Sequence, residues 1–299
     1  MNEPPAPNGP ALSSSTPRVL GILAGGGPFP GQVAAAAAAG GRPVFIVGFE
    51  DYAELSVIAA YPHAYARLGA AGGILALLRA NHCQDVCLVG PVKRPSLLDL
   101  RPDAEGVKIL ARIGRAAWSG DDGLLAAVVR VLAEEGFTVI GAHEIITGAV
   151  ATPGTLGRHA PDAQALSDIA RAVTVIRALG ALDVGQGCVV QQGFVLAVEA
   201  AENTDRMLGR VGELAVPGPG GVLVKLTKPG QERRADMPAI GPRTLTRAHE
   251  AGLRGVACEA GGTLLTDRAA CIAEADRLGL FLYGIHPDLA PDHLIGDPT

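Results

Sequence analysis

The stretch that decides the fold runs from residue 18 to residue 49, RVLGILAGGGPFPGQVAAAAAAGGRPVFIVGF. Two short apolar runs, at 18–24 and 44–49, flank three consecutive glycines and a small-residue segment at 32–39. Apolar runs of this length next to glycine are typical of buried strands, and the alanine-rich segment favours a helix. The order strand, glycine loop, helix, strand predicts the start of a parallel α/β sheet.

The same alternation continues through the first half of the chain. The further predicted elements are a helix at 74–81, a strand at 86–89, a helix at 123–135 and a strand at 137–140. Asp121 or Asp122 is expected to cap the third of these elements, because a carboxylate can accept the first free N–H groups of a helix. The pattern predicts a Rossmann-like domain over 18–148.

The second half has more hairpin character. A segment rich in proline and glycine at 149–161 predicts a linker, and a long helix is expected at 162–179. The predicted elements that follow are two strands around the turn 191–193, a strand at 220–228, helices at 245–252 and 269–279, and strands at 255–261 and 280–285. We therefore expect an α/β protein with a Rossmann-like parallel-sheet N-terminal domain followed by a mixed α/β catalytic domain at 162–287.

Composition limits the partners. The chain has 299 residues, a formal net charge of -5 and 4% aromatic residues, which argues against binding to nucleic acid. The five cysteines match no metal motif and are expected to be small core residues in a reducing cytoplasm. The proline-rich ends at 1–17 and 288–299 predict a disordered tail and a loose tail, with no signal peptide.

Glycines at the end of the first strand are the first candidate site. Gly26 and Gly27 would let backbone N–H groups approach a phosphate at the start of a helix. A tight structural turn is the alternative. Lys93 and Arg94 follow a later strand end, where they could hold a diphosphate or form a solvated charge pair.

Acidic residues near residue 200 are the second candidate site. Glu199, Glu202 and Asp205 lie within seven residues, with Thr204 between them. Carboxylates at this density suit Mg²⁺, which in turn suits phosphate chemistry. The alternative is ordinary capping of a helix that starts near Thr204.

Residues 225–241, KLTKPGQERRADMPAIG, form the third and strongest candidate. Lys225, Lys228, Arg233 and Arg234 could neutralise a diphosphate and the charge of its transition state. Asp236 could hold a metal or orient water. A salt-bridged loop without chemistry is the alternative. Glu259, at a later strand end, is expected either to accept a hydrogen bond from a ligand or only to shape a turn.

These motifs also occur together in one known group. The segments concerned are GILAGGGPFP, GPVKRPSLLDLRPD, DVGQ, VLAVEAAENTDRML, VLVKLTKPGQERRADMPAIGP and VACEAGGTLL. In this order they resemble the UDP-2,3-diacylglucosamine pyrophosphatases of the LpxI type, and the resemblance covers about residues 18–285. Asn203 stands where the family commonly has glycine, a mild departure because asparagine tolerates left-handed backbone.

The resemblance implies an Mg²⁺-dependent reaction of lipid A biosynthesis. Water attacks the α-phosphorus of UDP-2,3-diacylglucosamine, and the products are UMP and lipid X (2,3-diacylglucosamine 1-phosphate). It also implies two domains with the lipid between them, a homodimer, and a cytoplasmic protein with peripheral contact to the inner membrane. Asp236 is matched to catalysis.

The predicted site residues follow from the motifs and the resemblance together. Substrate contacts are expected from Gly26, Gly27, Lys93, Gln186, Thr204, Lys225, Lys228, Arg234 and Glu259. The predicted metal ligands are Asp236, Glu202 and Asp205.

Two other functions stay open at this point. One is a nucleotide-dependent oxidoreductase, in which Glu50 or Asp51 would bind a ribose about 25 residues after the glycine loop. The other is a lipid- or nucleotide-binding protein without catalysis.

Overall fold

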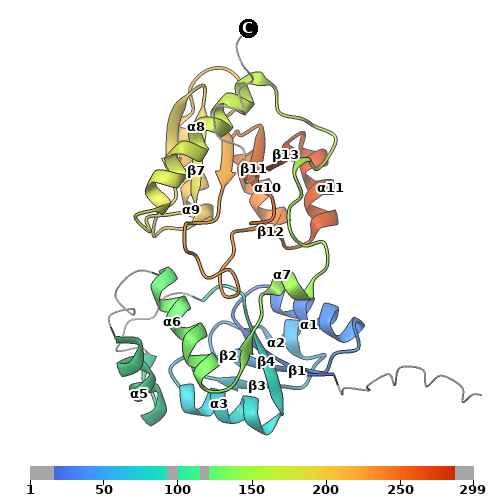
Figure 1. Ribbon diagram of the computed structural model, residues 1–299. Coiled ribbons are helices and arrows are strands. Elements are labelled where there is room, and N and C mark those ends of the chain that lie inside the picture. The colour runs from blue at the N-terminus through green and yellow to red at the C-terminus, as the bar shows by residue number, and fades with distance from the viewer. Residues whose placement is uncertain (1–16, 93–99, 115–120, 287–299) are drawn as a thin grey trace, which may run out of the picture.

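The computed structural model describes residues 17–92, 100–114 and 121–286. These residues form two lobes, with the N-terminal half of the chain in the lower lobe of Figure 1 and the C-terminal half in the upper lobe. Predictions for the tails at 1–16 and 288–299, and for Lys93 and Arg94, concern positions outside the described residues.

The described part of the lower lobe is built on a five-stranded parallel sheet with strand order β3-β2-β1-β4-β5. Its strands are β1 (Val19–Ala24), β2 (Val44–Phe49), β3 (His63–Ala66), β4 (Cys83–Val89) and β5 (Thr138–Val139). Its helices are α1 (Phe29–Ala39), α2 (Leu55–Ile58), α3 (Ala71–Ala80), α5 (Ala104–Ile113), α6 (Asp121–Glu134) and α7 (Ala142–Ile145). This strand order is that of a Rossmann-like half, so the predicted N-terminal fold is confirmed.

The upper lobe is mixed α/β, as predicted. Its described strands form a six-stranded sheet, β6-β13-β11-β9-β7-β8, and a small sheet of β10 and β12. The strands are β6 (Gly154–Thr155), β7 (Gly187–Gln191), β8 (Phe194–Val198), β9 (Val222–Lys225), β10 (Ala239–Ile240), β11 (Gly255–Glu259), β12 (Leu264–Leu265) and β13 (Phe281–Ile285). The helices are α8 (Ala163–Gly180), α9 (Thr204–Val211), the 3₁₀ turn η2 (Gly212–Leu214), α10 (Pro242–Glu250) and α11 (Arg268–Leu278). Strands β9, β11 and β13 run parallel, so their carboxyl ends meet at one edge.

Alternating strand residues pack against helices on both faces of each large sheet. In the upper lobe, Val222 and Val224 pack in one cluster with α8, whereas Leu223 packs in another with α9, α10 and α11. In the lower lobe, Ile22 belongs to a cluster with α1 and α7, and Leu23 to a cluster with α3 and α6. Both lobes therefore have a helix–sheet–helix core, because period-2 side chains alternate across the strands.

Helix α6 spans Asp121–Glu134, and the predicted cap at Asp121 or Asp122 concerns side chains outside the described part of the chain. Within the segment expected to be a linker, β6 pairs antiparallel with β13 and Val150 forms a bridge with Leu264. Ala149 and Val150 at the start of this segment pack with the lower-lobe cluster, whereas Ala151 and Leu156 pack into the upper lobe.

The five cysteines are free and buried, as expected of core residues. Burial raises the pKa of Cys83 to about 11 and that of Cys258 to about 12. Thiols with such pKa values are poor nucleophiles at neutral pH. Among the helices that the structure describes, none combines the length and apolar character needed to cross a membrane.

Candidate active site

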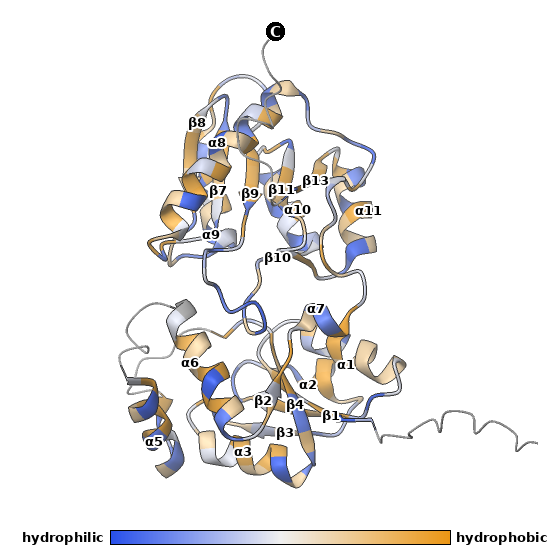
Figure 2. Ribbon diagram, in the orientation of Figure 1, coloured by the Kyte–Doolittle hydropathy of each residue, from blue (hydrophilic) through white to orange (hydrophobic). Residues whose placement is uncertain are grey.

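A polar loop from the upper lobe reaches the lower lobe. Residues 226–238, here called the Asp236 loop, connect β9 to β10, and Figure 2 shows hydrophilic residues where this loop approaches the lower lobe. Ala235 packs against the cluster on one face of the lower sheet, and Met237 belongs to the cluster on the other face. Asp236 lies between these two anchors. The loop therefore places Asp236 against the lower lobe although its sequence belongs to the upper one.

The glycine loop lies at the carboxyl edge of the lower sheet. The Gly25 N–H donates to the Val89 carbonyl at 2.7 Å, and the Gly26 N–H donates to the Pro91 carbonyl at 3.0 Å. These two N–H groups join the ends of β1 and β4. The loop is thus a close backbone junction next to the switch in strand order, where ligands of open α/β sheets usually bind.

The start of α1 offers few free donors. Pro28 is its N-cap and Pro30 follows in the first turn, and proline has no N–H group. Gly27 has a φ of +76° and its Cβ position faces open space. Of the predicted glycine contacts, Gly27 is therefore the one that leaves room for a ligand.

Three hydrogen bonds attach the Asp236 loop to the turn after β11. The Thr227 N–H donates to Glu259 Oε2 at 2.9 Å, and Thr227 Oγ1 donates to the Gly262 carbonyl at 3.0 Å. The Arg233 guanidinium donates to the Gly261 carbonyl. In this structure Glu259 therefore holds the first residues of the loop.

The Asp236 carboxylate is bound by a buried amide. Gln231 Nε2 lies 2.6 Å from Asp236 Oδ2 and 3.2 Å from Gln186 Oε1. Gln231 is 7% exposed, and its Oε1 accepts the Lys228 N–H at 3.0 Å. Gln186 and Asp236, both predicted site residues, are thus brought together. Gln231 was missed, although its place in the KPGQ motif was a signal.

Two cations of the loop, Lys228 and Arg234, are paired with carboxylates. Lys228 Nζ lies 2.6 Å from Asp183 Oδ1. Arg234 forms two hydrogen bonds to Glu232, at 2.8 and 2.6 Å, which raise the pKa of the guanidinium and lower the pKa of the carboxyl. The sequence prediction considered Asp236 and overlooked Glu232 in the same loop. Glu232 therefore already balances part of the positive charge of Arg234 before any ligand binds.

Lys225 lies in a buried polar chain behind the loop. Its Nζ donates to Thr204 Oγ1 at 2.9 Å, and that hydroxyl donates to Glu199 Oε1 at 2.6 Å. Lys225 and Glu199 are 5% and 7% exposed, and Glu199 Oε2 is buried with no hydrogen-bond partner among the described residues. Thr204 and Lys225, each predicted as a substrate contact, therefore touch one another, and Glu199 is a third member that the list of predicted site residues omitted.

The remaining acidic residues near α9 are engaged elsewhere. Glu202 lies 2.7 Å from Arg210, which lowers its pKa through a hydrogen bond, and Asp205 lies 2.8 Å from Arg243. Asn203 caps α9 by accepting the Arg206 N–H. In residues 17–92, 100–114 and 121–286, no group of three or more His, Cys, Asp or Glu side chains is placed to hold a metal ion.

A cavity of about 400 Å³ adjoins the loop at the carboxyl edge of the upper sheet. Its lining combines apolar side chains with charged groups. The residues are Val173, Arg177, Leu226, Thr227, Lys228, Pro229, Glu259, Ile285 and His286. Such a mixed lining suits a ligand with both anionic and apolar parts.

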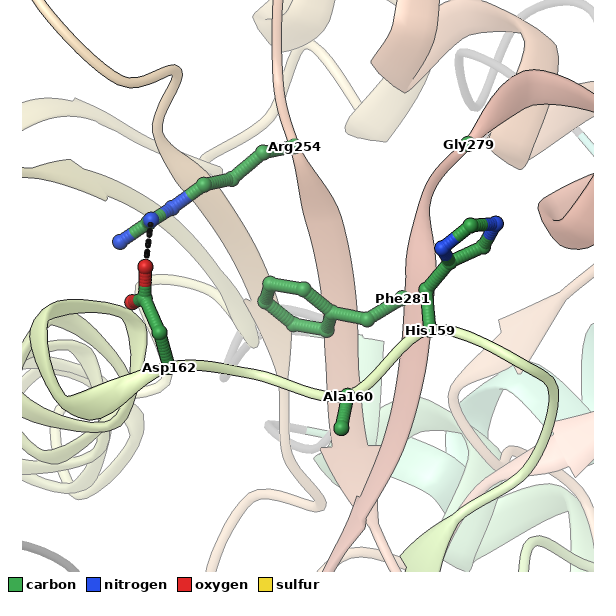
Figure 3. Close-up of a pocket in the computed structure, with 6 residues that line it drawn as sticks. All are labelled: His159, Ala160, Asp162, Arg254, Gly279 and Phe281. Atoms are coloured by element: carbon green, nitrogen blue, oxygen red, sulfur yellow. Dashed lines mark hydrogen bonds and ion pairs between the residues drawn. The ribbon is translucent and has the colours of Figure 1, made fainter.

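A smaller cavity of about 210 Å³ lies at the opposite edge of the same sheet (Figure 3). Arg254 and Phe281 line it at the starts of β11 and β13, and Arg254 lies 2.8 Å from Asp162. Two other guanidinium nitrogens, Nε and Nη2, have no partner among the described residues but are also closed to solvent. None of the predicted site residues lines this cavity.

Known proteins match both lobes. Residues 19–149 match the model of the LpxI N-terminal domain, and residues 152–283 match that of the LpxI C-terminal domain. A relative from Caulobacter vibrioides, named UDP-2,3-diacylglucosamine pyrophosphatase LpxI, is 44% identical over 280 residues. The match covers 92% of this chain and 100% of the relative. The chain belongs to the LpxI family.

The boundary between the LpxI domain models falls at residues 149–152, where the chain has crossed from β5 and α7 to β6. Both LpxI domains contribute to the candidate site, the N-terminal one through the glycine loop and the C-terminal one through the Asp236 loop. Membership in the LpxI family favours a hydrolase over the oxidoreductase and carrier alternatives.

Proposed function

We propose that this chain hydrolyses the diphosphate of UDP-2,3-diacylglucosamine in lipid A biosynthesis. Water would attack the α-phosphorus, and the bond from that phosphorus to the bridging oxygen would break. The uridine side would leave as UMP, and the sugar would keep the β-phosphate as lipid X. The name and near-complete coverage of the Caulobacter relative support the substrate, and the position of Asp236 between the lobes supports the site.

Asp236 is proposed as the catalytic residue. Its Oδ2 is occupied by Gln231, and its Oδ1 accepts no hydrogen bond from the residues that the structure describes. One carboxylate oxygen is therefore available to orient the attacking water or to bind a metal. Its neighbours Ala235 and Met237 are packed, which limits the motion of the carboxylate.

Mg²⁺ is proposed as the cofactor. Proteins commonly hold Mg²⁺ by one or two carboxylates together with water and substrate phosphates, so the open oxygen of Asp236 fits this type of site. When bound, the metal would neutralise phosphate charge. Glu202 and Asp205 are weaker ligands in this proposal, because each is already paired with an arginine.

The remaining predicted residues are proposed to bind different parts of the substrate from the two lobes. Lys225, Lys228 and Arg234 would balance the diphosphate, while Gln186 and Thr204 would donate or accept hydrogen bonds. Gly26, Gly27 and Lys93 would contact the substrate from the lower lobe. Glu259 is proposed to act mainly through its hydrogen bond to Thr227.

A cytoplasmic homodimer with peripheral contact to the inner membrane is also proposed. A lipid substrate has to be taken from a membrane surface, and none of the described helices is fitted to span one. Sedimentation of the purified chain and co-flotation with vesicles would test these two properties. A monomer at micromolar concentration, or no flotation with substrate-containing vesicles, would overturn the corresponding proposal.

The central test compares Asp236→Asn with Asp51→Asn. Both changes remove one carboxylate, and Asp51 is exposed at the end of β2. We expect Asp236→Asn to lose UMP release by about a thousandfold or more, with melting temperature preserved, and EDTA to stop the wild-type reaction until Mg²⁺ is restored. Asp51→Asn should match wild type. Full turnover in Asp236→Asn, or NAD binding that is lost in Asp51→Asn, would reject the proposal.

A further inference from the structure

The amide of Gln231 has a defined orientation. Its Oε1 accepts the Lys228 N–H at 3.0 Å, a role that only the oxygen of the amide can fill. Its Nε2 therefore faces the other two partners, Asp236 Oδ2 at 2.6 Å and Gln186 Oε1 at 3.2 Å. Reversing the amide would place oxygen against a carboxylate and NH₂ against an N–H group. The hydrogen-bond network thus permits one orientation.

All three polar hydrogen-bonding groups of Gln231 are used in this arrangement. The two N–H bonds of Nε2 serve one acceptor each, and the carbonyl serves a backbone donor. Gln231 is also 7% exposed, so water competes little for these bonds. A fully satisfied buried amide is a rigid connection, because any rotation leaves buried groups unpaired.

The rigid amide of Gln231 determines how the Asp236 carboxylate is oriented. A donor on Oδ2 restricts rotation of the carboxylate and so fixes the plane in which Oδ1 lies. The nearest loop cations do not take this place, since Arg234 is paired with Glu232 and Lys228 with Asp183. A neutral donor therefore orients Asp236 without adding a positive charge beside it. The carboxylate stays available to a metal ion or to the attacking water.

The same amide of Gln231 determines which end of the Gln186 side chain is available to a ligand. Because Gln186 Oε1 accepts from Gln231, the Gln186 NH₂ group is turned to other partners. Gln186 is partly exposed, just before β7. It can thus offer a neutral donor beside the carboxylate. Phosphate oxygens and acyl carbonyls are acceptors that such a donor would bind.

We infer that Gln231 is a positioning residue, which holds the Asp236 carboxylate for catalysis and turns the Gln186 amide into a donor toward the substrate. The inference rests on the proposed function of Asp236 and adds a residue that the site prediction did not contain. Gln231 acts through its two neighbours and does not itself touch the reacting atoms.

The test replaces the donor and keeps the shape. Gln231→Glu retains an oxygen for the Lys228 N–H but places a second carboxylate against Asp236. Asp236 Oδ2 then loses its donor and faces an acceptor, which should displace the carboxylate from its position. We expect kcat at pH 7 to fall about tenfold or more, with a smaller change in KM. The other charged groups near the loop, Glu144, Asp183, Lys228, Glu232 and Arg234, stay unchanged in this variant.

Gln192→Glu is the matched control. Gln192 is an exposed amide in the turn between β7 and β8, away from the carboxyl edge of β9. It carries the same change of charge and should keep the wild-type kcat and KM. A Gln231→Glu enzyme with the wild-type kcat overturns the inference.

A second readout separates this inference from the proposed function. The side-chain NH₂ protons of Gln231 can be followed by nitrogen-15 NMR in full-length protein labelled at glutamine, with Gln231→Glu assigning the signal. Asp236→Asn should shift these resonances whether or not the chain hydrolyses the substrate, because Nε2 donates to Asp236 Oδ2. Unchanged resonances reject the inference, whereas shifted resonances in a chain without UMP release reject only the proposed function.

Discussion

The Lys228 ammonium lies 2.6 Å from Oδ1 of Asp183, so an ion pair joins the Asp236 loop to the turn after α8. The lysine side chain is 10% exposed and the aspartate side chain 28%. Asp183 has a φ of +55°, which aspartate tolerates better than most residues. The pair therefore lies between the surface and the interior, where charge pairs are screened less than on an open surface.

Asp183→Asn should lower the free energy of unfolding by about 1–2 kcal/mol, because it removes the negative charge that faces a mostly buried ammonium. Denaturant unfolding of Asp183→Asn, Lys228→Met and the double variant measures the coupling, which we expect to be about 1 kcal/mol. Additive effects of the two changes would show that the pair does not stabilise the loop.

Glu259→Ala should lower kcat about tenfold or more with a smaller effect on KM. The reason is that the Thr227 N–H loses its acceptor and the start of the Asp236 loop is released. Glu259→Gln keeps an oxygen for the same N–H and should stay within about threefold of wild type. Steady-state kinetics distinguish the two. A raised KM in both variants would instead assign Glu259 to direct substrate contact.

Gly25→Ala should lower the free energy of unfolding by about 2–3 kcal/mol. A Cβ at this position would lie 2.5 Å from the Gly90 carbonyl oxygen, and backbone cannot yield as a flexible side chain can. Gly209→Ala is the control, since its Cβ meets nothing within 4 Å and lies within α9. It should stabilise by about 0.5–1 kcal/mol through helix propensity. Equal stability of the two variants would contradict the close approach of β1 and β4.

Glu274 should contribute a pH-dependent part of the stability. Hydrogen bonds from Arg277 and then Thr246 lower its pKa to about 2 from an ordinary 4.5. A lowered folded-state pKa stabilises the protein above 4.5, and this contribution is lost as pH falls from 4.5 towards 2. Thermal unfolding of wild type and Glu274→Gln should differ by about 1 kcal/mol or less at pH 7 and converge near pH 2. A difference that is constant with pH would contradict this origin.

The sequence predicted the strands that have continuous apolar runs. Strand β2 has the predicted bounds, and β13 begins one residue after its predicted start. Strand β3 was missed because His63–Ala66 is short and half polar, and it gains its place by pairing with β2. Helix α5 was missed although Asp103 caps it, since its exposed residues weaken the apolar pattern. Strand β6 has two residues and depends on β13, more than 120 positions away.

The sequence predicted which residues belong to the candidate site better than it predicted the contacts between them. Asp236, Gln186 and Lys228 were named, but no local pattern shows that Gln231 donates to Asp236 or that Lys228 pairs with Asp183. The first contact depends on the path of the Asp236 loop, and the second joins side chains 45 positions apart. Glu232 was visible in the sequence, and its pairing with Arg234 two residues away was predictable in principle.

The packing of Ala235 and Met237 into the lower lobe has a consequence for how the molecule can be divided. A gene cut at the boundary near residue 150 would yield two polypeptides with complementary apolar surfaces. The fragment that contains Asp236 also contains Ala235 and Met237, which pack against the other fragment. Each piece alone would expose that surface to solvent. When the two fragments are co-expressed, we expect them to associate as a split enzyme. The Asp236 loop would both hold the fragments together and place the carboxylate.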